Sequence, residues 1–317
     1  MIETAARTEI DSDALEQSDR VDFLRSYAFM GVHILALASL FTGVSVAAVV
    51  AMLITFWVRL FGITAGYHRY FSHRSFKTSR VFQFALAWLG ASAGQNGPLW
   101  WVSHHRHHHR HADTGDDVHP PGLKGFWWAH AGWILSRRYD GYDKSLVRDL
   151  RRFPELRLLD QLHMLAPLSL GVVLFAVGWW LEVAFPALGT TRWQMVGWGL
   201  FVSTMLLYHV TFLVNSVAHM WGRRRYATND QSRNNWWVAL ATLGEGWHNN
   251  HHRYPSSERQ GFYWWELDVT HYVLRAMERF RLVWDLRVPP ATAYRKKSPP
   301  SPPPSHLPPS APGRPGT

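Results

Sequence analysis

Four long apolar stretches dominate the pattern of hydrophobic and polar positions along the chain. They run over Tyr27–Val44, Val44–Gly66, Ala166–Phe185 and Trp193–Val214. A helix that crosses a bilayer needs about 17–25 predominantly apolar residues. The pattern therefore predicts four transmembrane helices, of which the first is the weakest. Long core helices of a soluble domain are the alternative, but four such runs with aromatic ends are hard to bury in any other way.

The segments between and around these stretches complete the predicted organisation. Val81–Gly94 and Gly125–Leu135 are apolar but too short to cross, which predicts helices in the interface or beneath a cytosolic cap. Residues 1–25 form a polar tail, and the proline-rich residues 288–317 are expected to be disordered. One membrane-embedded domain is expected over residues 26–287.

The net charge of +10, from 33 Lys and Arg against 23 Asp and Glu, is spread unevenly over these segments. If the outer loops are Thr42–Ser45 and Pro186–Arg192, all basic residues except Arg59 and Arg192 fall on the side of the termini. The positive-inside rule makes that side cytoplasmic. The charge therefore indicates topology and contact with anionic membrane lipids, whereas nucleic-acid binding would need a groove-reading motif that the chain lacks.

The 19 histidines and the absence of cysteine change the picture from a membrane protein to a membrane metalloprotein. Without cysteine the chain cannot form a disulfide framework, a thiol catalyst, a cysteine zinc site or its own iron–sulfur cluster. Three histidine boxes stand out, at His68–His73, His104–His111 and His248–His252, with His219 as a further single residue. All lie on the predicted cytoplasmic side, so they can converge at one membrane face.

Spacing within the boxes predicts which histidines can act together. Residues at i, i+3 and i+4 share one face of a helix. Two trios have this spacing: His105, His108 and His109, and His248, His251 and His252. His68 and His73 would diverge by about 140° on a regular helix, which predicts that they serve two different metals or straddle a helix end.

Counting the candidate ligands favours two metal ions. With His219 the boxes supply nine imidazoles, too many for one ion but suited to two ions with four or five each. Asn215 lies one helical turn before His219 and is placed to hold a water near the site. A loose metal-buffering tract or a metal transporter is the alternative, but a transporter would carry ligands along a path inside the spans.

The other polar residues receive weaker assignments. The histidines His33, His163 and His209 stand alone near apolar faces and are given no role. Those expected to fall off the shared face of the second box are His104, His107 and His111. Carboxylates often orient metal-binding imidazoles. The candidates for this function are Asp113, Asp117 and Glu245, with surface or cap positions as the alternative.

At these residues the chain resembles the membrane-bound fatty acid desaturases, specifically the acyl-CoA Δ9 (stearoyl-CoA) type. The matching segments are Gly62–Arg74, His105–His109, Asn215–His219 and Gly246–His252, and the resemblance covers most of the predicted folded region. It implies two ferrous iron ions with nine histidine ligands and a water held by Asn215. Residue by residue, the implied ligands are His68, His73, His105, His108, His109, His219, His248, His251 and His252.

The resemblance also implies a reaction. The family uses O₂ and two electrons to remove two hydrogens from a saturated fatty acyl chain, which yields a cis double bond and water. The double bond is at Δ9 in this type. Because the chain has no cysteine for a cluster and no evident haem-binding module, the electrons must come from a separate ferredoxin, rubredoxin or cytochrome.

Substrate residues follow from the same resemblance. The family threads its acyl chain through a kinked tunnel beside the metals, and the matching positions are Gln95, Trp101 and Thr211. The closed end of the tunnel matches Phe56 and Leu60 on the second predicted span, where bulk would limit chain length.

One departure from the family concerns the head of the substrate. The animal acyl-CoA enzymes carry an Arg-Asp pair just before the second box, and Ser103 and His104 stand there instead. The head group therefore stays open among acyl-CoA, acyl-carrier protein and phospholipid. The expected protein is an all-α membrane enzyme of a bacterial inner membrane, with four transmembrane helices and a cytoplasmic helical cap. A di-iron hydroxylase or alkane monooxygenase is the alternative reaction, although the segments Gly62–His73 and Asn215–His219 favour the desaturase.

Overall fold

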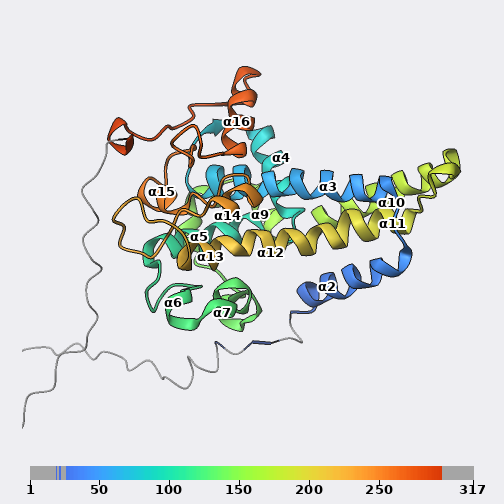
Figure 1. Cartoon of the computed structure of the whole chain (residues 1–317), viewed down its shortest axis with the longest axis horizontal. Coiled ribbons are helices and arrows are strands. Elements are labelled where there is room, and N and C mark those ends of the chain that lie inside the picture. Colours follow the sequence, from blue (N-terminus) through green and yellow to red (C-terminus); the bar gives the residue numbers. More distant parts are fainter. Residues whose placement is uncertain (1–18, 20, 23–25, 295–317) are drawn as a thin grey trace, which may run out of the picture.

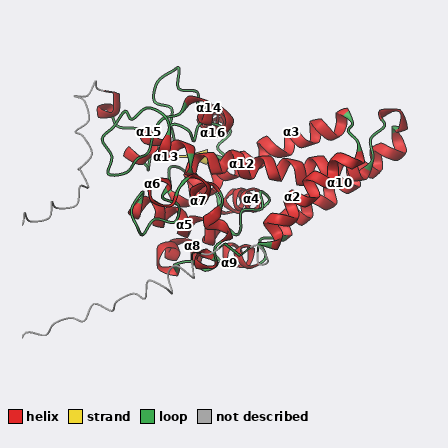
Figure 2. Ribbon diagram, turned by 60° about the horizontal axis from the view of Figure 1, so that its bottom comes forward, coloured by secondary structure: helices red, strands yellow, loops and turns green. Residues whose placement is uncertain are grey.

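The computed structural model describes residues 19, 21–22 and 26–294, and its regular structure is almost entirely helical (Figures 1 and 2). Long helices form a bundle that extends to one side, and shorter helices and loops form a cap at the other end (Figure 1). The bundle contains α2 (Tyr27–Ser39), η1 (Leu40–Thr42), α3 (Val46–Phe61), η2 (Gly62–Ser72), α10 (Leu165–Ala184), η6 (Pro186–Leu188), α11 (Arg192–Val196), η7 (Gly197–Val202), α12 (Ser203–Asn215) and α13 (Val217–Met220).

Three continuous helical segments are long and apolar enough to cross a membrane. They are Val46–Ser72, Leu165–Ala184 and Arg192–Met220, and they correspond to the second, third and fourth predicted spans. The first predicted span is a shorter apolar helix, Tyr27–Thr42, so the four-span arrangement stays a prediction. Apolar side chains on the outside of the bundle are widely exposed, as at Val46 (82%) and Val172 (70%), which fits a surface covered by lipid.

Local capping explains where two of the long helices begin. The Ser45 hydroxyl accepts a hydrogen bond from the Ala48 N–H at 3.3 Å, at the start of α3. Thr191 and Gln194 form a reciprocal capping box at the start of α11. Such caps satisfy N–H groups that a helix leaves free at its N-terminus. The two short loops predicted on the far side thus end where the capped helices begin.

The single basic residue within a predicted span turns inward. Arg59 is 2% exposed, and its guanidinium donates hydrogen bonds to the Ser92 carbonyl (3.2 Å), the Thr204 hydroxyl (2.6 Å) and the Ser203 hydroxyl. A charged side chain inside a membrane bundle is tolerated when polar groups of neighbouring helices receive it. Arg59 therefore ties α3 to α12 and to the turn after α4.

The cap is built from short helices that surround the histidine boxes. They are α4 (Arg80–Ala91), α5 (Pro98–His111), α6 (Pro121–Lys124), α7 (Phe126–His130), η3 (Gly132–Leu135), η4 (Arg137–Tyr139), η5 (Lys144–Val147), α8 (Arg148–Arg151), α9 (Pro154–Gln161), α14 (Trp236–Ala241), α15 (His248–Arg253), α16 (Val269–Arg279) and η8 (Ala291–Tyr294). The two weaker apolar runs form α4, and α7 with η3, within this cap. A two-residue antiparallel pairing of β1 (Lys77–Thr78) with β2 (Val283–Trp284) joins distant parts of the chain.

The helix that carries the second box is fixed at its N-terminus by a buried carboxylate. Asp160 of α9 accepts hydrogen bonds from the N–H groups of Leu99 (2.8 Å) and Trp100 (3.0 Å), which have no partner within α5. A Cβ atom at Gly97 would lie 2.3 Å from the Asp160 carboxylate, so this approach requires glycine. The contact sets the direction in which α5 presents its histidines.

The ends of the predicted domain fall close to the ends of the described chain. Residues 1–18 and 295–317, which carry most of the two predicted tails, lie outside the described residues. The described chain continues past the predicted boundary at residue 287 into η8. There Ala293 is buried, and its carbonyl accepts a hydrogen bond from the Tyr226 hydroxyl at 2.6 Å.

Candidate metal centre

The first histidine box lies in a π-helix rather than an α-helix. The N–H of His73 donates a hydrogen bond to the carbonyl of His68, five residues earlier, at 3.2 Å, and η2 ends there. In a π-helix the i→i+5 spacing closes one turn. The two rings therefore lie on the same side, with centroids 4.9 Å apart. The expectation that they serve different metals is wrong for this reason, although His73 does mark the helix end.

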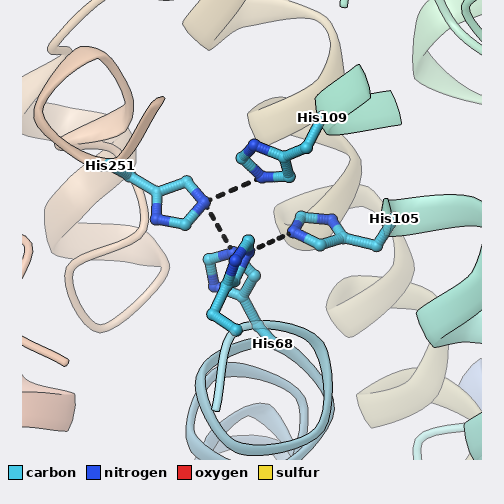
Figure 3. A group of neighbouring side chains, drawn as sticks. His68, His105, His109 and His251 are labelled. Carbon is cyan, nitrogen blue, oxygen red and sulfur yellow. Dashed lines mark hydrogen bonds between the residues drawn. The ribbon is translucent and has the colours of Figure 1, made fainter. Parts of the chain in front are cut away.

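Five histidines from three parts of the chain form one group, here called the five-histidine group. Its members are His68, His73, His105, His109 and His251. Figure 3 shows His68, His105, His109 and His251 with their rings turned toward one another. The Nε2 atoms of His68 and His251 are 3.0 Å apart, as are those of His109 and His251.

A second group, here called the four-histidine group, lies beside the first. Its members are His108, His219, His248 and His252. The Nε2 atom of His248 is 3.0 Å from that of His219 and 3.0 Å from that of His252. The Nε2 atom of His108 is buried without a hydrogen-bond partner among the described residues. An orphaned imidazole nitrogen that faces other imidazoles is the arrangement a metal ion would complete.

The spacing of the nitrogen atoms fits metal coordination. Two ligands at about 2.1 Å from one ion and at right angles to each other are about 3.0 Å apart. The nitrogen–nitrogen distances in both groups are close to that value. The structure thus contains two adjacent sets of histidines that could each hold one metal ion, and it brings together all nine predicted ligands.

Neighbouring residues in the sequence belong to different groups. On α5, His108 is in the four-histidine group and His109 is in the five-histidine group. On α15, His251 and His252 are divided in the same way. The ring centroids of His109 and His252 are only 4.5 Å apart, so the two groups touch. The i, i+3, i+4 trios therefore do not each serve one site, because each trio is shared between both.

Carboxylates support three of the four imidazoles in the four-histidine group. The Nδ1 atoms of His108, His219 and His252 each lie 2.9 Å from a carboxylate oxygen, of Asp117, Asp113 and Asp230 respectively. A carboxylate fixes Nδ1 as the protonated nitrogen, which leaves Nε2 free to bind a metal. Burial would raise the pKa values of these carboxyl groups, but the adjacent histidines and hydrogen bonds hold them below the usual range.

The five-histidine group has one carboxylate, and that carboxylate is neutralised from behind. Glu245 contacts the Nδ1 atom of His68 and also accepts hydrogen bonds from the guanidinium of Arg69 at 3.0 and 3.1 Å. Arg69 pairs as well with Asp268, at 2.9 Å, and is fully buried. Burial opposes the ionised form, but His68 and Arg69 outweigh it and lower the pKa of Glu245 to about 2.

The metal-facing imidazoles outside the spans are held in their neutral form. Burial and the neighbouring imidazoles lower the pKa values well below the usual range at His73, His105, His109, His248, His251 and His252. Metals bind the neutral imidazole, because the protonated ring has no free lone pair. These six imidazoles can therefore accept a cation without first losing a proton. At His108 burial opposes the charged form, but Asp117 and other carboxylates outweigh it and raise the pKa.

A cavity of about 240 Å³ reaches the metal centre and is lined by the predicted substrate residues on the cap side. Gln95, Trp101 and Thr211 line it together with His105 of the five-histidine group and with Asn215. The Gln95 amide donates a hydrogen bond to the Thr211 hydroxyl at 2.8 Å and accepts one from the Trp101 indole at 3.3 Å. This network places polar groups in a wall that also contains aromatic residues, among them Phe29 and Phe212.

The two residues assigned to the closed end of the tunnel lie elsewhere. Phe56 and Leu60 are buried in the main hydrophobic core, with exposed fractions of 9% and 0%, and do not line this cavity. Their role in limiting chain length stays a prediction.

Two polar residues near the centre were missed by reasoning from the sequence. Asp230 orients His252, and it lies in a polar loop without any box-like pattern. His119 is buried beside His108 and Asp117 and could form a third metal-binding trio with them. Its Nδ1 atom has no hydrogen-bond partner among the described residues. The Asp117-x-His119 spacing was the signal that could have found it.

Comparison with known proteins identifies the family. The model of the family described as "Fatty acid desaturase" matches residues 43–286, a region that contains all nine histidines of the centre. The chain belongs to the fatty acid desaturase family. It is accordingly an oxidoreductase of the desaturase type.

Individual desaturases are similar to the chain over most of its length. It is 38% identical to the palmitoyl-monogalactosyldiacylglycerol delta-7 desaturase of Arabidopsis thaliana over 85% of this chain and 70% of that protein. It is 36% identical to the sn-1 stearoyl-lipid 9-desaturase of Anabaena variabilis, over 87% of this chain and 97% of that protein. An acyl-CoA C20 Delta5-desaturase of Anemone leveillei is 37% identical, over 75% of this chain and 73% of that protein. The desaturase relatives therefore include proteins named for lipid-bound and for CoA-bound acyl chains.

Proposed function

We propose that this desaturase uses O₂ and two electrons to introduce a cis Δ9 double bond into a saturated fatty acyl chain. The observation that carries the proposal is the convergence of nine histidines in two touching groups at the wall of a cavity. His105 belongs both to the five-histidine group and to the cavity lining. A chain bound in the cavity would therefore lie directly against the metal centre.

The proposed metal is iron, one ion in each histidine group. Neutral imidazole suits iron as well as copper, nickel or zinc, so the choice of iron rests on family membership. Bound iron would supply the O₂ activation and one-electron chemistry that amino acid side chains cannot provide. Asn215, which lines the cavity one turn before His219, is proposed to hold a water beside the four-histidine group.

The chain's own residues position the substrate. We assign the bend of the acyl chain to the hydrogen-bonded residues Gln95, Trp101 and Thr211, and the end of the tunnel to Phe56 and Leu60. Trp101 stacks on His105 with ring centroids 5.0 Å apart, so its indole fixes the position of one ligand and one cavity wall together. Precise placement of the reacting carbons lowers the barrier by removing their freedom of motion.

The proposed substrate is an acyl chain esterified in an intact lipid. Ser103 and His104 occupy the positions of the Arg-Asp pair of the acyl-CoA enzymes, but both side chains are buried, at 2% and 8% exposure. Ser103 donates a hydrogen bond to the Asp143 carbonyl and His104 contacts the Trp100 carbonyl, so neither offers a charge to a CoA phosphate. Several relatives are named for lipid-bound acyl chains, which supports the same choice.

The remaining elements of the proposal concern the membrane and the electrons. We infer four spans, with α2 as the first, both termini and the metal centre on the cytoplasmic side, and a bacterial inner membrane as the location. Electrons would come from a separate ferredoxin, rubredoxin or cytochrome, because the chain has no cysteine for a cluster of its own. The predicted domain at residues 26–287 would contain the complete catalytic unit.

Lipid analysis of an expressing strain tests the proposal. Cells that make the protein together with a suitable electron donor are expected to contain new Δ9 monounsaturated acyl chains by gas chromatography–mass spectrometry. The His109→Ala variant should insert in the membrane normally but give no product. A hydroxy fatty acid or an oxidised alkane would favour the hydroxylase or monooxygenase instead. Absence of any new product with an active donor, or exchangeable and variable metal content, would contradict the proposal.

A further inference from the structure

Three histidines outside the metal centre stand in a row at the junction of bundle and cap. His33 of α2 and His209 of α12 lie 3.1 Å apart, from Nε2 to Nε2. The other ring nitrogen of His209, Nδ1, lies 3.1 Å from Nε2 of His130 on α7. His209 therefore uses its two nitrogens on opposite neighbours. The expectation that His33 and His209 stand alone is wrong, because a cap helix brings a third imidazole to them.

The row ends at each side on a carbonyl oxygen. At its outer end, Nδ1 of His33 lies 2.8 Å from the Phe29 carbonyl. At its inner end, Nδ1 of His130 lies 3.0 Å from the Ser216 hydroxyl, which donates to the Phe212 carbonyl at 3.0 Å. Carbonyl oxygens can only accept hydrogen bonds, so the His33 ring and the Ser216 hydroxyl must each donate a hydrogen to the carbonyl at their end.

Counting hydrogens shows that the row has room for an added proton. Five contacts join the two carbonyl oxygens through three imidazoles and one hydroxyl, and each contact needs one hydrogen. A neutral imidazole carries one N–H and a hydroxyl one O–H, which gives four hydrogens for five contacts. One added proton satisfies every contact at once. A proton taken up at His33 can reach the Ser216 hydroxyl by short shifts along these hydrogen bonds, and the hydroxyl can release it by turning away from the Phe212 carbonyl, which cannot pass a proton on.

The row runs from an exposed position to the buried Ser216 hydroxyl, which does not line the active-site cavity but adjoins Asn215, which does. His209 is exposed, whereas His130 is 5% exposed and Ser216 is fully buried. Ser216 is followed along the chain by the helix of His219 and preceded by Asn215, which lines the cavity together with His105. Burial and the neighbouring His209 lower the pKa of His130 to about 4, so a proton would pass through His130 rather than rest there.

The geometry distinguishes this row from a further metal site. Metal ligands converge on one point, whereas His209 separates its two neighbours by the width of its ring. The described groups of histidines and carboxylates that could hold an ion do not include these three. A linear series of three imidazoles and a hydroxyl joined by hydrogen bonds is the arrangement of a proton relay.

We propose that His33, His209, His130 and Ser216 form a proton relay that delivers protons to the metal centre during O₂ reduction. The inference rests on the proposed desaturase function. In that reaction two C–H bonds of the substrate break and O₂ is reduced to two waters. The four hydrogens of these waters come from the two substrate hydrogens and two protons, and the donor protein supplies two electrons. The two protons must reach a buried centre, and the relay is their path.

The test compares His209→Gln with the unmodified, iron-loaded enzyme in nanodiscs of stearoyl phospholipid supplied with a ferredoxin donor. Glutamine can still hydrogen-bond to both neighbours but does not pass on a proton as an imidazole does. We expect product formation to fall by about tenfold, with a larger solvent deuterium isotope effect and more peroxide released per O₂ consumed. Iron content should be unchanged. His163→Gln, which changes a half-buried histidine outside the row, is the matched control.

Each outcome decides a separate point. The relay would be overturned if the isotope effect, the rate and the peroxide release of His209→Gln were all unchanged. It would also be overturned by a slower rate without any change in isotope effect, because that result indicates that His209 only holds the helices together. If His209→Gln does not accumulate, His33→Gln at the outer end gives the same comparison. An unmodified enzyme that forms no double bond would refute the proposed function itself, and with it the relay.

Discussion

The five-histidine group and the four-histidine group share α5 and α15 but differ in what lies behind their imidazoles. Three carboxylates contact the four-histidine group, whereas the single carboxylate behind the five-histidine group is paired with a buried arginine. A carboxylate on Nδ1 makes an imidazole a stronger electron donor. The group with fewer ligands therefore has more anionic support, which predicts two metal positions of different electronic character.

Removing one imidazole from each group is expected to have the largest effect. Loss of an outer partner costs about 10–100-fold in metal affinity or activity, so loss of a ligand should reduce product formation at least about 100-fold. Both His248→Ala and His251→Ala should therefore be inactive. The metal content should differ, because His251→Ala leaves four imidazoles and His248→Ala leaves three.

Elemental analysis of the purified variants measures this difference. We expect close to one metal per chain in His248→Ala and a value between one and two in His251→Ala. Equal losses of metal in the two variants would contradict the difference between the two groups. They would mean that the binding of each ion depends more on the other ion than on its own ligands.

The Asp113→Asn variant tests the anionic support alone. Asp113 has a positive φ of 61°, a conformation that asparagine tolerates, and the amide can still contact His219 and Gln231. Loss of the charge should lower activity and metal affinity by about 10-fold or more. Metal release to a chelator should be faster from one of the two positions only. Identical release from both positions would show that the carboxylates do not distinguish the groups.

The matching change behind the five-histidine group, Glu245→Gln, should act mainly on folding. It leaves Arg69 buried with one carboxylate fewer, and breaking a buried ion pair costs about 3–5 kcal/mol. The pKa of Glu245 falls from its usual 4.5 to about 2 in the folded protein, so its stabilising contribution is complete above pH 4.5 and is lost as the pH falls through 2. The difference in unfolding free energy between the metal-free protein and its Glu245→Gln variant should therefore shrink over that range. A difference that is constant with pH would contradict the assignment.

The smallest effect is expected for a histidine of the second box outside both groups. His107 turns away from the centre, and its Nε2 atom lies 2.7 Å from the Asp116 carbonyl. The His107→Gln variant should change activity by less than about twofold and leave the metal content unchanged. Loss of metal from this variant would show that His107 also contributes to one of the two groups.

Apolar patterning was sufficient to predict where three of the long helices begin to within two residues. The first span was harder to predict, since Tyr27–Thr42 is apolar but short, and neither length nor composition decides whether such a helix crosses. The π-helical conformation of η2 could not be predicted from the sequence. This segment packs against α4 and α5, and no periodicity in Gly62–Ser72 marks its π-helical form.

The three boxes and His219 supplied the nine histidines that the structure brings together, but their division between two groups was not predicted. Spacing along a helix shows which side chains share a face, and that face at α5 is wide enough for His108 and His109 to point at different partners. The supporting carboxylates Asp113 and Glu245 were ambiguous for a similar reason. Their function depends on the distant histidine that each contacts, and Asp230 carried no local signal at all.

The division of adjacent residues between the two groups makes chain length itself a constraint. His108 and His109 serve different groups, and His251 and His252 repeat the arrangement on another helix. One inserted or deleted residue in either box would rotate every later histidine of that helix by about 100° and turn it away from the group to which it belongs. The division between the two groups therefore depends on the register of each box. The spacing of adjacent residues sets the separation of the two metal positions, once on α5 and once on α15.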